Sequence, residues 1–275
     1  TYAKSDYVAS LSKTSERVAH GANATGCTMT VMSTTAQYSY AVDGWYSGAT
    51  KKTSNATYAP TAVTADATYT AKGTRTLRSY TVTYNKGSYI SSVSRTSESV
   101  SYGSNAAGST ATVMANTAQY SYAFDGWYNG STRVSTALTY APTNITGALT
   151  LEARATRTTR RYTATIGVDS SCTGRCQVGS GSTVWTSSFS ETVNYGDKIN
   201  LQCKLLNSGD VFAGWYENET LLSTNLTYPI TVTSNRNIVA KVWFIDVSPT
   251  SLSYEASGGS KTVTVKSNIP SWSVS

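Results

Sequence analysis

The residue types that carry most enzyme chemistry are sparse in this sequence. His20 is the only histidine, so a Ser/His/Asp or Cys/His arrangement has a single possible base. In an internal repeat of the sequence, Tyr102 stands at the position of His20. A position that accepts tyrosine is typical of a half-buried strand residue rather than a base or a metal ligand. The sequence therefore predicts that the chain is not an enzyme and has no catalytic residue, cofactor or metal site.

Two aspartates, Asp43 and Asp125, each precede a Gly-Trp pair. Acid–base chemistry by paired carboxylates needs two carboxyl groups roughly 5–10 Å apart. The two aspartates belong to different copies of the repeat, and no second acidic residue accompanies either one at a matching position. We therefore expect each aspartate to lie in a turn, where its side chain bonds the nearby backbone.

The chain has four cysteines, and Cys27 stands apart from the other three. Cys172 and Cys176 form a C-x3-C pair without an accompanying histidine, which is a weak zinc signal. If the protein is exported, a disulfide is favoured instead. Four cysteines allow three connectivities, and we favour a disulfide of Cys203 with Cys172 or with Cys176, which leaves the other thiols free.

Tryptophans offer two alternatives, the stacking of a sugar ring on an exposed face or the anchoring of a small β-domain. Three of them recur in an apolar context at equivalent positions, which favours the core. Trp185 is different, because it lies in a Gly/Ser/Thr-rich insertion around residues 179–187, and it is the better candidate for an exposed binding residue. The predicted core residues are Trp45, Trp127 and Trp215 with Tyr58, Tyr140 and Tyr228.

The net charge of +7 includes arginines that alternate with threonine near residue 160. On a strand, Arg157, Arg160 and Arg161 either form a stripe that binds an anionic ligand or charge an edge strand and so block unwanted sheet pairing. No phosphate-binding loop and no nucleic-acid motif with interleaved aromatics is present, so a nucleic-acid partner is not expected. No run approaches the roughly 18 apolar residues of a membrane span, so membrane insertion is not expected either.

The dominant feature of the sequence is an internal repeat. Residues 38–46 read YSYAVDGWY, and residues 120–128 read YSYAFDGWY. At this offset of 82, residues 7–81 and 89–163 share about 42 of 75 positions without a gap. A diverged third copy contains residues 211–216, VFAGWY, with Ala213 in place of the aspartate. The predicted domains are residues 1–79, 80–161 and 162–245, the first with a truncated opening strand.

Alternation of apolar and polar residues predicts an all-β or nearly all-β fold. In the second copy, strands are expected near residues 80–86, 98–102, 110–115, 119–128, 137–141 and 147–157, with a helical turn allowed only within 90–98. The last strand of one copy runs almost directly into the first strand of the next, which predicts an extended, semi-rigid rod. Residues 246–275 alternate over 247–254 and 261–265 and predict the first strands of an immunoglobulin-like sandwich, which needs about 100 residues.

The F-x-GW-Y element with its following Thr-Tyr pair resembles the Listeria–Bacteroides repeat, also called the internalin B-repeat type, over nearly all of residues 1–244. Residues 247–275 resemble the opening of a BACON domain, a module proposed to bind carbohydrate. The first resemblance implies tandem β-grasp-like modules in surface proteins, and the second implies a Bacteroidetes-type source. Neither family carries a shared catalytic set.

These observations predict a non-enzymatic extracellular stalk or adhesin that projects another domain from a bacterial surface. Two alternatives remain open. One is a phage virion fibre or decoration protein, and the other is a carbohydrate-binding module attached to a glycan-active enzyme. The partners expected from these alternatives are glycans or a host surface, further copies of the chain, or a larger surface or virion assembly.

Overall fold

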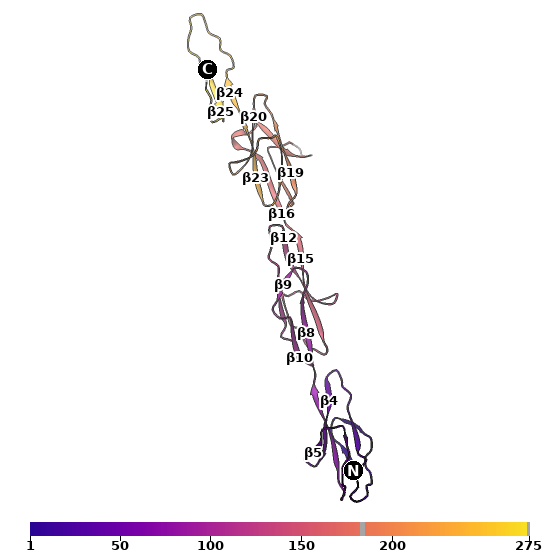
Figure 1. The fold of residues 1–275 in the computed structure, drawn as a ribbon. Helices are drawn as coiled ribbons and strands as arrows, with labels where there is room; N and C mark the ends of the chain where they lie inside the picture. Colours follow the sequence, from indigo (N-terminus) through magenta and orange to yellow (C-terminus); the bar gives the residue numbers. More distant parts are fainter. Residues whose placement is uncertain (182–184, 274–275) are drawn as a thin grey trace. The chain divides into compact units, whose positions relative to one another are not determined.

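A computed structural model describes residues 1–181 and 185–273 of the 275-residue chain (Figure 1). Strands account for nearly all of the regular structure, and the helical content of the described residues is one three-residue turn, η1 (Ser170–Cys172). The expectation of a nearly all-β fold is therefore confirmed. The chain forms two compact units, one of residues Thr1–Met114 with Ala123–Thr156 and one of Ala115–Tyr122 with Arg157–Ser275.

The first unit begins with residues 1–78, which we call the first segment. Its larger sheet has the order β1-β7-β4-β5, in which β1 and β7 are parallel and β4 is antiparallel to β7. Its smaller sheet has the order β2-β3-β6. Buried residues of both sheets form one hydrophobic cluster around Trp45. The strands are β1 (Tyr2–Lys4), β2 (Val8–Leu11), β3 (Cys27–Val31), β4 (Tyr38–Ser47), β5 (Thr50–Thr53), β6 (Thr57–Tyr58) and β7 (Tyr69–Leu77).

The second segment, residues 79–160, has the same arrangement with one further strand. Its larger sheet has the order β10-β8-β15-β12-β13 and its smaller sheet the order β14-β11-β9. The central strands β8 and β15 are parallel, and β10 is antiparallel to β8. The strands are β8 (Ser79–Lys86), β9 (Ile90–Val93), β10 (Ser97–Ser101), β11 (Ser109–Val113), β12 (Tyr120–Asn129), β13 (Thr132–Ser135), β14 (Thr139–Tyr140) and β15 (Leu149–Thr159).

Two details of this segment differ from the sequence expectation. The prediction that a helical turn could lie within residues 90–98 is wrong, because β9 occupies residues 90–93 and pairs with β11. Ile90 anchors β9 with its side chain 6% exposed in the core. Strand β13 was not expected, because its polar residues carry no alternation. It forms because the chain folds back on β12 after the turn at Gly130.

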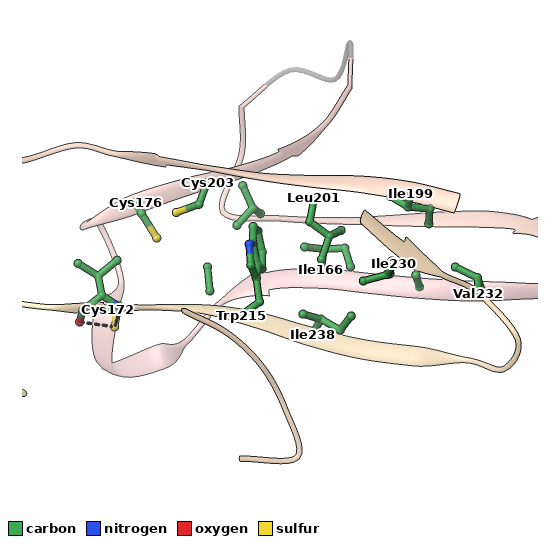
Figure 2. Packing of buried hydrophobic residues seen from close by; sticks show 14 residues of the cluster. Ile166, Cys172, Cys176, Ile199, Leu201, Cys203, Trp215, Ile230, Val232 and Ile238 are labelled. Atoms are coloured by element: carbon green, nitrogen blue, oxygen red, sulfur yellow. Dashed lines mark hydrogen bonds between the residues drawn. The ribbon is translucent and has the colours of Figure 1, made fainter. Parts of the chain in front are cut away.

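The second unit contains the third segment, residues 161–244. Its larger sheet has the order β18-β16-β23-β20-β21 and its smaller sheet the order β17-β19-β22, around a core centred on Trp215 (Figure 2). Strands β16 and β23 are the parallel pair. The strands are β16 (Arg161–Val168), β17 (Cys176–Ser180), β18 (Ser188–Asn194), β19 (Lys198–Leu205), β20 (Val211–Glu217), β21 (Thr220–Ser223), β22 (Thr227–Thr231) and β23 (Arg236–Trp243).

The last residues of the second unit form an antiparallel pair, β24 (Ile245–Ser248) with β25 (Thr264–Ser267). The strand expected over residues 247–254 therefore begins earlier, at Ile245, and ends at Ser248. The second strand, expected over 261–265, begins three residues later, at Thr264, and ends at Ser267. The alternation continues beyond Ser248, but no neighbouring strand pairs with residues 249–263 in the described part of the chain. Pairing, rather than pattern alone, decides where a strand ends.

Candidate functional site

The three recurring tryptophans are fully buried. Trp45, Trp127 and Trp215 are each 0% exposed, so none of them offers a ring face to a sugar. Each indole N–H donates a hydrogen bond to a backbone carbonyl in the loop that follows the next strand, because a buried indole needs a partner for its polar edge. The acceptors are the carbonyls of Ala56, Leu138 and Asn225, at 3.0, 3.1 and 3.1 Å. The half-buried Tyr58, Tyr140 and Tyr228 pack against the same three cores.

The Gly-Trp pair forms a β-bulge, which explains its glycine. Gly44 lies where the register of β4 against β7 shifts, with φ of +151°. A Cβ atom there would collide with the backbone carbonyl of Thr53 on the neighbouring β5. Gly126 has φ of +158° and a Cβ on it would lie 2.5 Å from the Ser135 carbonyl oxygen. The repeated glycine is thus required by a close approach of two strands.

The bulge also places the preceding aspartate, which lies within a strand and not in the expected turn. Asp43 accepts hydrogen bonds from the hydroxyl of Tyr46 at 3.0 Å and from the ammonium of Lys51 at 2.9 Å. Those two donors, Lys51 first, lower the pKa of the Asp43 carboxyl. The Lys72 ammonium lies over the Tyr46 ring, 4.2 Å from the ring centroid. The second segment repeats this group with Asp125, Tyr128, Arg133 and Arg154.

The arginines near residue 160 are engaged within the chain. Arg157 lies over the Tyr120 ring at 4.3 Å. Arg160 donates to the Thr117 carbonyl at 3.0 Å, and Arg161 donates to the Thr192 carbonyl at 2.7 Å. The three guanidinium groups therefore serve contacts between loops and strands of the second unit. Both interpretations of these arginines, binding of an anionic ligand and charging of an edge strand against unwanted sheet pairing, remain predictions.

Trp185 is 36% exposed and precedes Thr186, which bridges to Val178. The insertion that holds it was expected around residues 179–187, and residues 182–184 of that range lie outside the described residues. Along β16, Gly167 pairs with Ser188 near Trp185, whereas Arg161 pairs with Asn194 at the other end. Six residues of strand span about 20 Å. The structure therefore does not bring Trp185 and Arg161 into one site.

The structure shows a contact at the segment joint that sequence reasoning missed. In the first unit, the Tyr80 hydroxyl donates to the Ala36 carbonyl at 2.5 Å, and the Arg78 guanidinium donates to the Thr35 carbonyl at 2.8 Å. The Arg78 backbone N–H donates to the Gln37 carbonyl at 2.9 Å. The loop 35–37 of one segment is thus bonded to the opening residues of the next.

The same contact recurs within the second unit, shifted by 82 residues. Tyr162 donates to the Ala118 carbonyl at 2.7 Å, and Arg160 donates to the Thr117 carbonyl and, from its backbone, to the carbonyl of Gln119. The signal was available in the sequence, because Arg78 and Tyr80 recur as Arg160 and Tyr162, and residues 35–37 read TAQ as do residues 117–119. Only the structure shows that the two repeated pieces are in contact.

A half-buried glutamate is a second feature that the sequence analysis missed. Glu16 accepts hydrogen bonds from the Tyr2 hydroxyl at 2.5 Å, the Thr25 hydroxyl at 2.6 Å and the Gly26 backbone N–H at 3.1 Å. The hydrogen bonds from Thr25 and Tyr2 lower the pKa of Glu16 to about 2. In the second segment, Glu98 accepts from the Tyr84 hydroxyl and from the backbone N–H groups of Ala107 and Gly108.

The Glu16 carboxylate is surrounded by donors from its own segment. The Tyr2 hydroxyl of the edge strand β1, the Lys13 ammonium and groups of the loop residues Thr25 and Gly26 all donate to it, so both carboxyl oxygens are occupied. The equivalent in the third segment is Glu191, which pairs with Ala164 in register and bonds Ser180. In the described part of the chain, no group of three or more His, Cys, Asp or Glu side chains is placed to hold a metal ion.

The cysteines are thiols in the structure, and three of them share the core of the third segment. Figure 2 shows Cys176 and Cys203 side by side on the paired strands β17 and β19, with Cys172 apart. The hydrogen bond with Cys176 and burial both raise the pKa of the Cys203 thiol. Cys172 is bound elsewhere, because its sulfur donates to the Val242 carbonyl at 3.2 Å. Of the two pairings left open by the sequence, this geometry favours Cys176 with Cys203.

His20 lies in a turn and is exposed, not in the half-buried strand position that the repeat suggested. Tyr102 also lies in a turn that directly follows β10. Among the described residues, no helix is long and apolar enough to cross a bilayer.

Comparison with known proteins gives one result. No curated protein matches the chain. The profile of the Listeria–Bacteroides repeat domain matches residues 80–154 and 179–241, which lie in the second and third segments. Each matched range contains the buried tryptophan of its segment and, directly before it, a glycine with a positive φ. Because the two ranges cover just over half of its residues, the chain belongs to the Listeria–Bacteroides repeat family.

Proposed function

We propose that this chain is a non-enzymatic extracellular stalk, which projects a binding or functional domain from a bacterial surface. The observation that carries the proposal is the repeated joint, in which the loop of one segment is hydrogen-bonded to the first residues of the next. A spacer needs such a connection, since a flexible linker would let successive segments reorient independently.

The connections leave no room for such a linker. Arg78 is the single residue between β7 and β8, and Arg160 is the single residue between β15 and β16. Both arginines are themselves bonded to the preceding segment. One residue held at both its backbone and its side chain restricts rotation far more than a Gly/Ser linker does.

The proposal includes two finer assignments. The first is that residues 1–79 are a third copy of the repeat, supported by the shared order of β1-β7-β4-β5 and β8-β15-β12-β13. The second is that residues 246–275 open a BACON-like domain, supported by the pairing of Val247 with Val265 in the alternating strands. The extracellular location is supported by membership of the repeat family.

Small-angle scattering of the full chain tests the stalk. We would insert Gly-Gly-Ser-Gly-Gly-Ser after Leu77 and after Thr159, which separates both joints. A matched control carries the same insertion after Gly48, a turn glycine with open space around it. For the native chain and the control we expect a pair-distance distribution with one well-defined maximum dimension. For the joint variant we expect a distribution that reflects many chain dimensions. A native chain whose distribution of dimensions is as broad as that of the joint variant refutes the stalk. Antibody labelling of intact cells checks the location.

Glycan binding is a second candidate function, favoured by one observation. Trp185 keeps 36% of its surface exposed, whereas the three repeated tryptophans, Trp45, Trp127 and Trp215, are fully buried. An exposed indole face can stack on a sugar ring. A glycan array with the full chain tests this proposal, with Trp185→Ala as the variant. Saturable binding that the variant loses supports it, and equal signals from both proteins contradict it.

A further inference from the structure

Three half-buried tyrosines gather around Arg75 in the first segment. The Arg75 guanidinium lies over the rings of Tyr38 and Tyr7, at 4.3 and 5.0 Å from their centroids. The ring centroids of Tyr7 and Tyr40 are 5.9 Å apart. Tyr38 and Tyr40 lie on β4 beside β7, which carries Arg75, and Tyr7 lies in the turn before β2. We call these four residues the arginine–tyrosine cluster.

The polar groups of this cluster are available to a ligand. Among the described residues, the exposed Arg75 guanidinium makes no hydrogen bond and no ion pair. The hydroxyls of the three tyrosines have no hydrogen-bond partner in the same part of the chain. Tyr7 also holds a backbone φ of +67°, which a bulky residue adopts only where the surrounding structure imposes it. An arginine and three tyrosines with unused polar atoms therefore meet at one exposed place.

The cluster recurs in the sequence of the second segment. The offset of 82 carries its four residues onto Tyr89, Tyr120, Tyr122 and Arg157. Arg157 lies over the Tyr120 ring at 4.3 Å, as Arg75 lies over Tyr38. Residues 1–160 contain 14 Lys and Arg against 7 Asp and Glu, so they account for the whole net charge of +7. That balance favours an anionic ligand for these two segments.

The third segment has an arginine at the same place, with the cation and the ring exchanged. Arg175 occupies the position of Tyr7, because each of their carbonyls accepts a hydrogen bond from the residue directly after the neighbouring strand, β19 or β3. Phe244 occupies the position of Arg75, four residues after the alanine that pairs with the buried tryptophan. The Arg175 guanidinium lies over the Phe244 ring at 3.9 Å.

Two carboxylates of the chain itself bind that arginine. Asp210 accepts from Arg175 at 3.2 Å, and Asp246 forms a second ion pair with it. By the same count along the strands, these aspartates stand at the positions of Tyr40 and Leu77. The third segment thus fills this place with its own carboxylates, whereas the first segment has the arginine without them.

We propose that the arginine–tyrosine cluster of the first segment, and its repeat in the second, binds a sugar that bears a carboxylate. The carboxylate takes the edge of the Arg75 guanidinium, as Asp210 and Asp246 do for Arg175. The tyrosine rings contact the sugar, and their hydroxyls bond its hydroxyl groups. An acidic peptide would satisfy the arginine and leave the tyrosine hydroxyls without partners. The inference rests neither on the stalk nor on Trp185, which lies in the third segment.

Isothermal titration calorimetry of the full chain with an oligomer of galacturonic acid tests this site. The site variant is Arg75→Gln with Arg157→Gln. The matched control, Arg17→Gln with Lys86→Gln, removes the same charge from two exposed side chains outside the clusters. We expect the site variant to weaken binding about tenfold or more and the control to stay within about twofold of the native chain. No binding by the native chain, or equal weakening in both variants, overturns the proposal.

A second variant supplies each cluster with a carboxylate of its own. Leu77→Asp with Thr159→Asp places aspartates at the position of Asp246 and changes the net charge as the control does. Leu77 and Thr159 are exposed, so the core is left intact. We expect this variant also to weaken binding about tenfold or more, because the arginines become paired within the chain. An unchanged affinity overturns the proposal.

Two further probes decide the class of ligand. A neutral galactose oligomer lacks the carboxylate, and a glutamate oligomer of the same length lacks the sugar ring. We expect both to bind at least about tenfold more weakly than the galacturonic acid oligomer. Equal binding of the glutamate oligomer would assign the cluster to acidic peptides and overturn the proposal. Equal binding of the galactose oligomer would overturn the role of the carboxylate.

Discussion

The hydroxyl of Tyr80 donates to the carbonyl of Ala36 at 2.5 Å, which ties the first strand of one segment to a loop of the segment before it. The hydroxyl is the only polar atom of the ring, so its removal isolates this contact. Tyr80→Phe should speed hydrogen exchange of the neighbouring Arg78 amide, which is bonded to Gln37. Because one hydrogen bond contributes about 1 kcal/mol net, we expect the exchange rate of the Arg78 amide to rise about fivefold.

Tyr254→Phe is the matched control, because Tyr254 is 52% exposed and lies far along the chain from both joints. Exchange at Arg78 should be unchanged in that variant. If Tyr80→Phe also leaves it unchanged, the hydroxyl does not hold the joint.

The buried tryptophans should dominate stability. Trp127→Phe removes part of the core and leaves the Leu138 carbonyl without its indole donor, so we expect a loss of about 2–3 kcal/mol in the free energy of unfolding. Trp185→Phe makes the same chemical change at an exposed position and should stay within about 0.5 kcal/mol of the native value. Urea unfolding of both variants checks this. Comparable losses of unfolding free energy would contradict the difference in burial between Trp127 and Trp185.

The bulge glycine can be compared with a turn glycine in the same strand pair. Gly126→Ala would bring its Cβ within 2.5 Å of the Ser135 carbonyl oxygen, whereas Gly130, with φ of +60°, has nothing within 4 Å. We expect Gly130→Ala to cost about 1–2 kcal/mol from backbone conformation alone. Gly126→Ala should cost roughly 3 kcal/mol or more, because strain and collision combine. Equal losses of unfolding free energy would argue against the close approach.

Stability of the first unit should depend on pH through Glu16. Its pKa is lowered to about 2 in the folded chain, so the folded state favours the ionised carboxylate. The stabilisation is fully present above the unfolded pKa near 4.5 and is lost as the pH falls toward 2. Glu16→Gln should therefore lower the melting temperature at pH 7, and the difference from the native chain should shrink steadily below pH 4.5. A difference that stays constant down to pH 2 would rule out this linkage.

Oxidation should select one pair of cysteines. In the oxidised chain we expect a Cys176–Cys203 disulfide with Cys27 and Cys172 left as thiols, because the first two are hydrogen-bonded neighbours and Cys172 is bound to Val242. The bond closes a loop of moderate length and should stabilise the chain by about 3 kcal/mol. Peptide mapping by mass spectrometry identifies the pairing, with Cys172→Ala as the control that keeps it. A Cys172–Cys203 product would overturn the assignment.

The sequence by itself determined the repeat, the β-rich fold and the residues that would form each core. These features depend on local alternation and on spacing along the chain, and both are visible in the linear order of the residues. Trp45 and Trp127 could be identified as core residues because they recur at one offset in the same apolar pattern.

The tertiary structure decided what depends on strands that are distant in sequence. Asp43 lies in a strand instead of a turn because the bulge forms only against β7 and β5. Strand β9 exists because β11 pairs with it, and Arg160 is held by a loop more than forty residues earlier in the chain. Register and long-range hydrogen bonds set these positions, and no local pattern of residue types records which strands will become neighbours.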